Sequence, residues 1–267
     1  MMRKKRLTLR IITIFLILIV ILYLNSLFNQ QFTTLIKNDF FKYKKSKLLN
    51  YNYTTDTEKV RQSLKPLCTC RKDENICVHL DEFENYNIYH TKDSINISTY
   101  KMTMSEFEDS NIVCNPFHVL RRGRKQKVIS YSIGPYEELN VNHLKQLIHS
   151  IKHWYPDWII RVYHNSNIDQ STICELECFQ DKELVYYDNI DFCDVNEFPF
   201  VFLNVLHLPA RFWRWLPIGD SFVDTFLSRD LEACIGQRES IVVNEWMKTD
   251  YLFHSIRGKL GTVACVK

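Results

Sequence analysis

The feature that most constrains the fold is an alternation of apolar, strand-like runs with amphipathic, helix-like runs after residue 126. The pattern predicts strands over Lys127–Ile133, Trp158–Tyr163, Leu184–Tyr187 and Phe222–Leu227. It predicts helices over Val141–Trp154, Val201–Trp215 (interrupted near Pro209) and Arg238–Met247. Strands that alternate with helices predict an α/β fold with a mostly parallel sheet. In such sheets, ligands bind beyond the carboxyl ends of the strands.

The N-terminus predicts a membrane anchor. Ile11 to Leu24 is apolar apart from Thr13 and Tyr23. With Leu7, Leu9, Leu27 and Phe28 the span reaches the roughly 20 residues that a helix needs to cross a bilayer, and we place the anchor at residues 11–28. A cleaved signal peptide is the alternative, but no small-residue cleavage site follows the span. Cations precede the span, so we expect residues 1–10 to be cytoplasmic and the remainder lumenal. The chain is therefore expected to be a single-pass type II membrane protein.

The same basic cluster accounts for the net charge. The formal charge of the chain is +3. Five cations before the span contribute +5, so the rest of the chain carries −2. The five are Arg3, Lys4, Lys5, Arg6 and Arg10. Because the body of the protein has no positive excess, we expect no nucleic-acid partner.

Residues 29–66 are polar and lack periodicity, which predicts a stem. Two N-glycosylation sequons follow the span, at Asn52 and Asn96. The segment Arg121–Lys125, "RRGRK", is interpreted as a surface linker, with a basic processing site as the alternative. We place a Cys-containing lumenal region at 67–126, before an α/β domain at 127–267.

Nine cysteines are a high count for a reducing compartment. Four of the cysteines lie in the first half: Cys68, Cys70, Cys77 and Cys114. We predict that these four contribute to disulfides that brace the region before Gly123, which contains no glycine. A zinc site is the alternative for Cys68, Cys70, Cys77 and His79, although this spacing fits no common zinc pattern.

Two carboxylates, Asp230 and Glu232, follow the last predicted strand one residue apart. Such a pair can aim at one point, and Mg²⁺ or Mn²⁺ commonly takes one or two carboxylates, with phosphate and water as further ligands. A strand-end D-x-E therefore suits a metal clamp for a diphosphate. Taken alone, it equally suits a solvated turn.

The surroundings of this pair resemble a family. "VISYSIG", "YPDWIIRVYHN" and the run from Arg211 to Gly258, "RFWRWLPIGDSFVDTFLSRDLEACIGQRESIVVNEWMKTDYLFHSIRG", are similar to nucleotide-diphospho-sugar transferases of the GT-A fold. The resemblance covers about Lys127 to Gly258. It implies a Rossmann-like GT-A domain that uses Mn²⁺ or Mg²⁺ to transfer sugar from a nucleotide sugar donor to a glycan or protein acceptor. An anchor, a stem and a lumenal domain also fit a glycosyltransferase of the Golgi or another secretory-pathway membrane.

Carried over by position, Asp230 and Glu232 would be the metal clamp, with His254 as a third ligand; a structural histidine is the alternative. Arg229 would neutralise a phosphate or pair with Asp220 or Asp224. Arg214 would contact the nucleotide.

Two further assignments follow from the resemblance. Asp220 would contact substrate or, with Asp224, order the loop. Arg238 and Glu239 would form an ion pair or cap on the helix that closes the site. No residue is assigned as the catalytic base.

The chain departs from the family after the F-H pair, where "KLGTVACVK" replaces the sequence that normally builds the acceptor site. The domain over 127–267 is accordingly expected to be incomplete. An inactive or truncated membrane scaffold with the same sheet is the leading alternative function. A Cys-stabilised ectodomain, in which the D-x-E is only a turn, is a further one.

Overall fold

The structure is a computed structural model that describes residues 61–266, with gaps at 109, 136, 181–186, 198–204 and 259–260. The predicted tail, the anchor over 11–28, the stem up to residue 60 and the sequon at Asn52 lie outside the described residues. Within the described part of the chain, no helix has both the length and the apolar character needed to cross a membrane.

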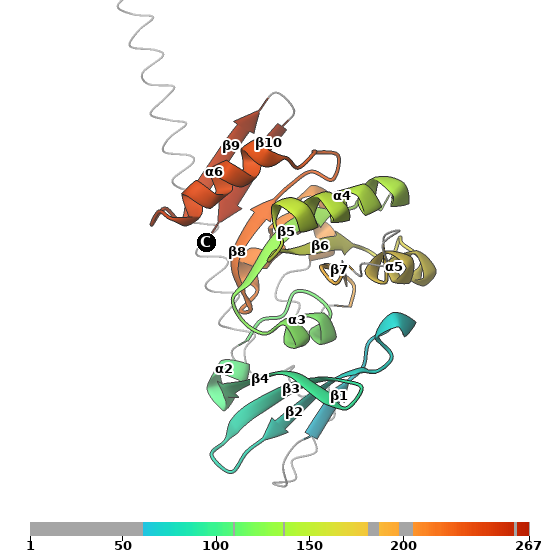
Figure 1. The fold of residues 1–267 in the computed structure, drawn as a ribbon, viewed down its shortest axis with the longest axis vertical. Coiled ribbons are helices and arrows are strands. Elements are labelled where there is room, and N and C mark those ends of the chain that lie inside the picture. The colour runs from blue at the N-terminus through green and yellow to red at the C-terminus, as the bar shows by residue number, and fades with distance from the viewer. Residues whose placement is uncertain are drawn as a thin grey trace, which may run out of the picture. The chain divides into compact units, whose positions relative to one another are not determined.

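A six-stranded sheet organises the second half of the chain, in the order β7-β6-β5-β8-β10-β9 (Figure 1). The strands are β5 (Gln126–Ser132), β6 (Ile159–His164), β7 (Ile190–Asp194), β8 (Val223–Ser228), β9 (Phe253–Gly258) and β10 (Gly261–Val266). Strands β5 to β8 are parallel, whereas β10 runs antiparallel to both β8 and β9. The predicted α/β class with a mostly parallel sheet is confirmed, and the four parallel strands are consistent with a Rossmann-like fold.

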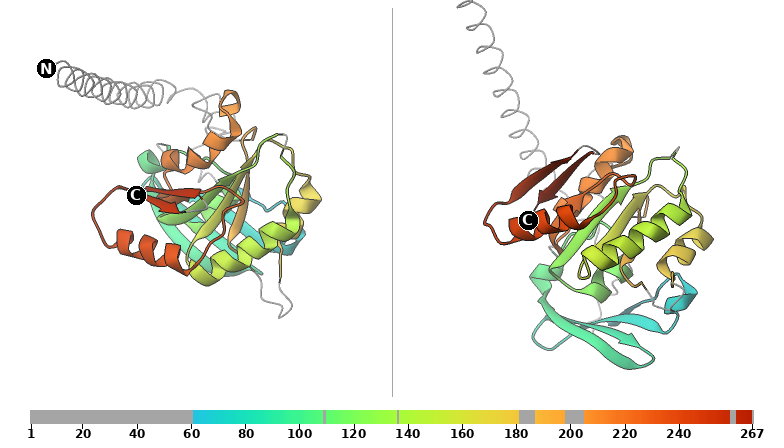
Figure 2. Two further views of the ribbon diagram at one scale, coloured as in Figure 1. Left: turned by 90° about the horizontal axis from the view of Figure 1, so that it is seen from above. Right: turned by 45° about the horizontal axis from the view of Figure 1, so that its top comes forward.

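Helices cover one face of this sheet. They are α4 (Val141–Trp154), α5 (Gln170–Glu177) and α6 (Gln237–Met247), and Figure 2 shows α4 and α6 on the face opposite the segment before β8. Leu144, Ile148 and Ile151 of α4 lie one or two turns apart and pack with Ile160 and Val162 of β6. This face is therefore a nearly uniform apolar core.

The strands predicted at 127–133, 158–163 and 222–227 correspond to β5, β6 and β8, and the helices at 141–154 and 238–247 to α4 and α6. The strand predicted at 184–187 is wrong at Tyr187, its one described residue, which lies in a loop. The strand of this part of the sheet is β7, which begins at Ile190. The predicted helix at 201–215 is helical and interrupted near Pro209 over its described part, as expected, but its segments are not α-helical. Two 3-10 helices replace it, η3 (Val205–His207) and η4 (Ala210–Gly219), with Pro209 before η4 and Pro217 inside it.

The region before β5, which showed no clear pattern in the sequence, contains a second sheet. Its four strands are antiparallel in chain order: β1 (Arg61–Leu64), β2 (Glu74–Leu80), β3 (Asn85–Lys92) and β4 (Ile95–Thr103). Three short helices complete the region: η2 (Thr69–Arg71), α2 (Met104–Glu108) and α3 (Pro116–Arg122). On β2, Ile76 and Val78 are buried and their neighbours only half-buried, so a period-two signal was present in a short strand.

The small sheet and α3 pack against the second face of the large sheet. Ile76, Ile88 and Phe117 share one buried cluster with Tyr163 of β6 and Cys193 of β7. The regions 67–126 and 127–267 therefore share a core.

Three disulfides join the same two regions: Cys68–Cys174, Cys70–Cys178 and Cys114–Cys193. The predictions for Cys68, Cys70 and Cys114 are confirmed, and the zinc alternative is wrong because two of its thiolates are oxidised. The prediction for Cys77 is wrong. Cys77 lies within β2 as a free thiol. The exposed Cys234, in the second region, is also a free thiol.

The "RRGRK" segment is a linker only in part. Arg121 and Arg122 belong to α3, and Arg121 is buried, whereas Arg124 and Lys125 are exposed. The surface-linker interpretation is therefore wrong for the two arginines on the helix, because both are drawn inward by carboxylates of β7 and the loop before it.

Candidate functional site

The chain leaves β8 in a way that separates the next two side chains. Consecutive residues of an extended chain point to opposite faces, and this alternation continues past Ser228. Arg229 contacts Glu239 of α6 on the helix-covered face, whereas Asp230 contacts Arg214 of η4 on the other face. The end of β8 therefore directs the Arg229 side chain toward the core and the Asp230 side chain toward the open edge.

Arg229 braces the loop after β8. Its side chain is 2% exposed, and Nη2 donates to the carbonyl oxygens of Ala233 at 3.3 Å and Cys234 at 2.9 Å. Glu239, which pairs with Arg229, also accepts a hydrogen bond from the Tyr155 hydroxyl at 3.2 Å. Arg229 is thus paired with α6, rather than with Asp220 or Asp224, and is buried away from any phosphate. Glu239 pairs with Arg229 and not with the exposed Arg238.

Asp230 and Arg214 are brought together from two elements. The Asp230 side chain is 58% exposed and pairs with Arg214, which is 22% exposed. The 3-10 helix that carries Arg214 is held by the buried Trp213, whose indole N–H donates to the Val205 carbonyl at 2.9 Å. Trp215 also makes an edge contact with Phe226 of β8. Arg214 therefore stands beside Asp230 on a supported segment, and its Nε is buried without a hydrogen-bond partner in the described part of the chain.

Glu232 lies two residues further on, exposed in the turn at 231–232. The turn is held in place by His143 of α4, whose Nε2 lies 3.0 Å from the Leu231 carbonyl oxygen. The loop from β8 to α6 is thus tied at Leu231, Ala233 and Cys234, while both predicted clamp carboxylates remain exposed to solvent.

His254 lies apart from these carboxylates. The register places it level with Leu227, three residues before Asp230, and two strands away across β10. Two strand spacings alone amount to about 10 Å. Its ring stacks on Trp246 of α6 with centroids 6.4 Å apart. Among the described residues, no three His, Cys, Asp or Glu side chains form a group that could hold a metal ion, so the structure favours a structural role for His254.

Asp220 is occupied within the protein. Its side chain is fully buried and lies 2.6 Å from Nη1 of Arg161, and its Oδ1 accepts from the Phe222 amide at 2.9 Å. Burial opposes the charge on Arg161, but the adjacent Asp220 outweighs this effect and raises the pKa of Arg161. Asp220 thus orders the turn before β8 and is inaccessible to a ligand, while Asp224 is exposed and accepts from its neighbour Thr225.

Polar groups that the sequence analysis did not single out occupy the neighbouring strand ends. Asn167, after β6, donates to the Gly134 carbonyl after β5 at 3.0 Å. Asn196, after β7, donates to Asp194 and to Ser166 at 2.9 and 3.0 Å. The signal was visible as "HNSN" and "DVN" after two strands. Together with Asp230, these groups make the carboxyl edge of the parallel strands polar.

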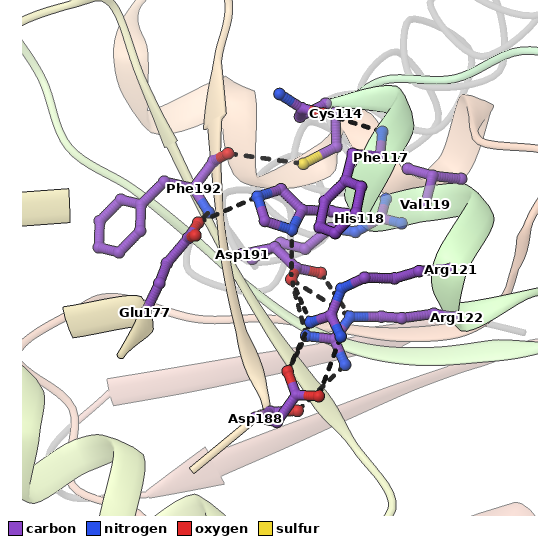
Figure 3. A network of polar contacts seen from close by, with 12 residues as sticks. Cys114, Phe117, His118, Val119, Arg121, Arg122, Glu177, Asp188, Asp191 and Phe192 are labelled. Atoms are coloured by element: carbon purple, nitrogen blue, oxygen red, sulfur yellow. Dashed lines mark hydrogen bonds and ion pairs between the residues drawn. The ribbon is translucent and has the colours of Figure 1, made fainter. Parts of the chain in front are cut away.

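A second concentration of charge was also missed, and it lies in the interior. Figure 3 shows His118 of α3 between two carboxylates, with Nε2 3.1 Å from Glu177 and Nδ1 3.3 Å from Asp191. Arg122 pairs with Asp191 at 2.7 Å, and Arg121 with Asp188 at 2.5 Å. We call this set, with Arg71 and Glu74, the junction network.

The junction network is paired, and it is largely buried apart from the Asp188 side chain, which is 39% exposed. Burial raises the pKa of Asp191, but Arg122, His118 and Arg121 together outweigh it and hold that pKa well below the usual range. The pKa of Asp188 is lowered in the same way by Arg121, Arg122 and Arg71 against the opposing effect of burial. These charges join α3 and the small sheet to β7, so the junction network is structural.

Comparison with models of protein families finds no match, and no curated protein matches the sequence. The assignment of a function therefore rests on the residues and their arrangement.

Proposed function

We propose that the chain is a metal-dependent glycosyltransferase whose donor is a nucleotide sugar. The observation that carries the proposal is the placement of Asp230, which is exposed at the carboxyl end of a parallel strand and beside an arginine, with Glu232 in the following turn. This edge is where ligands of open α/β sheets bind. The motif around these residues supports the finer proposal of a GT-A domain.

The donor set fits a hard divalent cation. Asp230 and Glu232 offer exposed carboxylate oxygens, which Mn²⁺ and Mg²⁺ prefer, and such ions readily take their remaining ligands from water and phosphate. The guanidinium of Arg214 already stands beside Asp230 as a positive charge. When bound, the cation would stabilise negative charge on the leaving nucleoside diphosphate.

The protein groups then have distinct roles. Asp230 would hold the cation, and Glu232, with its longer side chain, would bind it directly or through water. Arg214 would turn from Asp230 to the diphosphate, because the cation replaces it as the counter-charge. The buried Arg229–Glu239 pair would keep the loop in position without touching the ligand.

The proposal extends to location. The predicted membrane anchor and stem, together with the disulfides, suit a lumenal domain in the Golgi or another secretory-pathway membrane, where the acceptor would be a glycan or a protein. The disulfides support an oxidising compartment.

Calorimetric titration of the full chain with nucleoside diphosphates tests the clamp. Binding is expected to require Mn²⁺ or Mg²⁺ and to weaken by roughly tenfold or more in Asp230→Asn, as expected when a group that supports a metal is altered. Asp224→Asn, an exposed aspartate at the start of the same strand, is the matched control and should bind like the wild type. Binding that is equal with and without metal, or unchanged in Asp230→Asn, would contradict the clamp.

A transfer assay separates the enzyme from the scaffold alternative. Metal-dependent hydrolysis or transfer of sugar from a nucleotide sugar is expected of the wild type and not of Asp230→Asn. Metal-dependent binding without any turnover, over a panel of donors and acceptors, would favour the inactive scaffold.

A further inference from the structure

The small sheet has an exposed apolar edge. β4 is an outer strand of its sheet, and its first residues include Ile95 at 70% and Ile97 at 53% exposure. The run Ile95–Tyr100, "INISTY", carries no charged residue and is rich in residues that favour strands. An uncharged edge of this kind is a template for pairing with another chain.

The same six residues contain the sequon Asn96-Ile97-Ser98, and Asn96 is exposed. The strand register places Asn96 opposite Thr91 and Ser98 opposite His90, so Ile97 is an extra residue that interrupts the ladder. The hairpin turn before it has Asp93 and Ser94 at positive φ, 49° and 65°. The acceptor asparagine thus lies at a hairpin end, on an outer strand, beside a bulge.

The compartment is set by an independent observation. Three disulfides connect the small sheet region to the large sheet, and disulfides persist in oxidising compartments, where asparagine glycosylation also occurs. We propose that Asn96 carries an N-linked glycan and that this glycan covers the exposed edge of β4.

The chemistry needs one further reactant, a lipid-diphosphate-linked oligosaccharide. The amide nitrogen of Asn96 forms a bond to the anomeric carbon of the sugar as the bond from that carbon to the diphosphate oxygen breaks. The lipid diphosphate leaves with the bonding electrons, and one amide proton passes to the base of the transferring enzyme. The bulky, hydrated product would stand beside Ile95 and Ile97 and would keep a second strand from approaching.

The first test identifies the modified residue. The full chain carrying Asn52→Gln is produced in secretory cells and treated with an N-glycosidase in heavy-oxygen water, which leaves a labelled aspartate at each former glycan. Label at position 96 is expected, together with a one-glycan shift in gel mobility. The shift should be lost in Ser98→Ala, which removes the sequon, and retained in Ser98→Thr, which preserves it. An unmodified Asn96 in protein whose disulfides have formed would overturn the proposal.

The second test addresses the covering of the edge. In the same background, Asn96→Gln is expected to increase the aggregated share several-fold in size-exclusion chromatography. Adding Ile95→Lys and Ile97→Lys should restore the monomeric peak without the glycan, because charge protects an edge strand in its place. If Asn96→Gln stays as monodisperse as the glycosylated protein, the glycan does not have this role.

Discussion

The junction network and the carboxyl edge of β8 both hold arginine–aspartate pairs, but the two regions differ in exposure. Asp191 has a fully buried side chain that faces Arg122 and His118. Asp230 is 58% exposed, and Arg214 is its one ion-pair partner among the described residues. The density of charge is greater at the junction, yet the unused binding capacity is at the edge. The proposed binding site is therefore placed at the edge, where the charge is exposed and only partly neutralised, and not at the junction.

The contribution to the free energy of unfolding should also be greater for the buried Asp191–Arg122 pair than for the exposed Asp230–Arg214 pair. Removing one partner of a buried pair leaves the other charge without compensation in a poorly solvated place, at a cost of about 3–5 kcal/mol. An exposed pair is already solvated and contributes about 0–1 kcal/mol. The following variants test this contrast.

The largest effect is expected for Asp191→Asn. Arg122 and His118 would lose their shared counter-charge, so the free energy of unfolding should fall by about 3–5 kcal/mol in denaturant titrations. Asp224→Asn, which alters an exposed aspartate, should change it by less than about 0.5 kcal/mol. A loss below about 1 kcal/mol for Asp191→Asn would show that the junction network does not hold the two regions together.

The next effect concerns the disulfide beside the network. Replacing both Cys114 and Cys193 by serine should lower the free energy of unfolding by about 2–5 kcal/mol. The pair closes 79 residues of chain and lies where α3 approaches β7. Titration under non-reducing conditions, with the oxidised wild type as the reference, measures the loss. Equal stability of the variant and the oxidised wild type would be the contrary result.

Acid should weaken the junction network. Because the folded-state pKa of Asp191 and of Asp188 is depressed, their stabilisation is present above the unfolded pKa of about 4 and is lost as the pH falls below it. The free energy of unfolding should therefore start to decline below about pH 5 and should go on declining below about pH 3, toward the depressed folded-state pKa values. Asp191→Asn should show a shallower decline than the wild type, and an unchanged slope would refute the assignment.

The smallest effect on stability is expected for Arg214→Gln, at about 0–1 kcal/mol. Ligand binding should respond in two opposite ways. Affinity for Mn²⁺ alone should rise, because a competing cation is gone, while affinity for the metal–nucleotide pair should fall by about tenfold, the loss expected for one charge-assisted hydrogen bond. Changes in the same direction would show that Arg214 does not exchange partners, even if the metal clamp itself is correct.

The sequence predicted those elements whose burial follows a simple period. Helix α4 was found because Leu144, Ile148 and Ile151 repeat at helical spacing. Strand β6 was found from its apolar run in the sequence, and all six of its residues are buried in the structure. Strand β7 was missed because Asp191 interrupts its apolar run, and an aspartate is tolerated there only since α3 supplies Arg122 from a distant part of the chain. The second sheet was missed because β3 and β4 carry many polar residues, and their buried positions do not alternate cleanly along the strand.

The site was predictable to a similar extent. A strand end beside acidic residues could be located from the order of the residues, so Asp230 and Glu232 were correctly placed beyond β8. The partner of Arg229 depended on a turn that brings α6 back beside the strand, which local sequence does not specify. The separation of His254 from Asp230 depended on a hairpin, β9 and β10, that was not predicted at all.

The three disulfides also have a consequence for the covalent connectivity of the molecule. Each joins a cysteine before Gly123 to one after residue 170, so all three bridge the exposed Arg124–Lys125 step. A protease that cut there would open a ring rather than release a fragment. The nicked protein would migrate as one species until its disulfides were reduced and as two pieces afterwards. Two polypeptides held in this way would still present the small sheet, the junction and the β8 edge as one body.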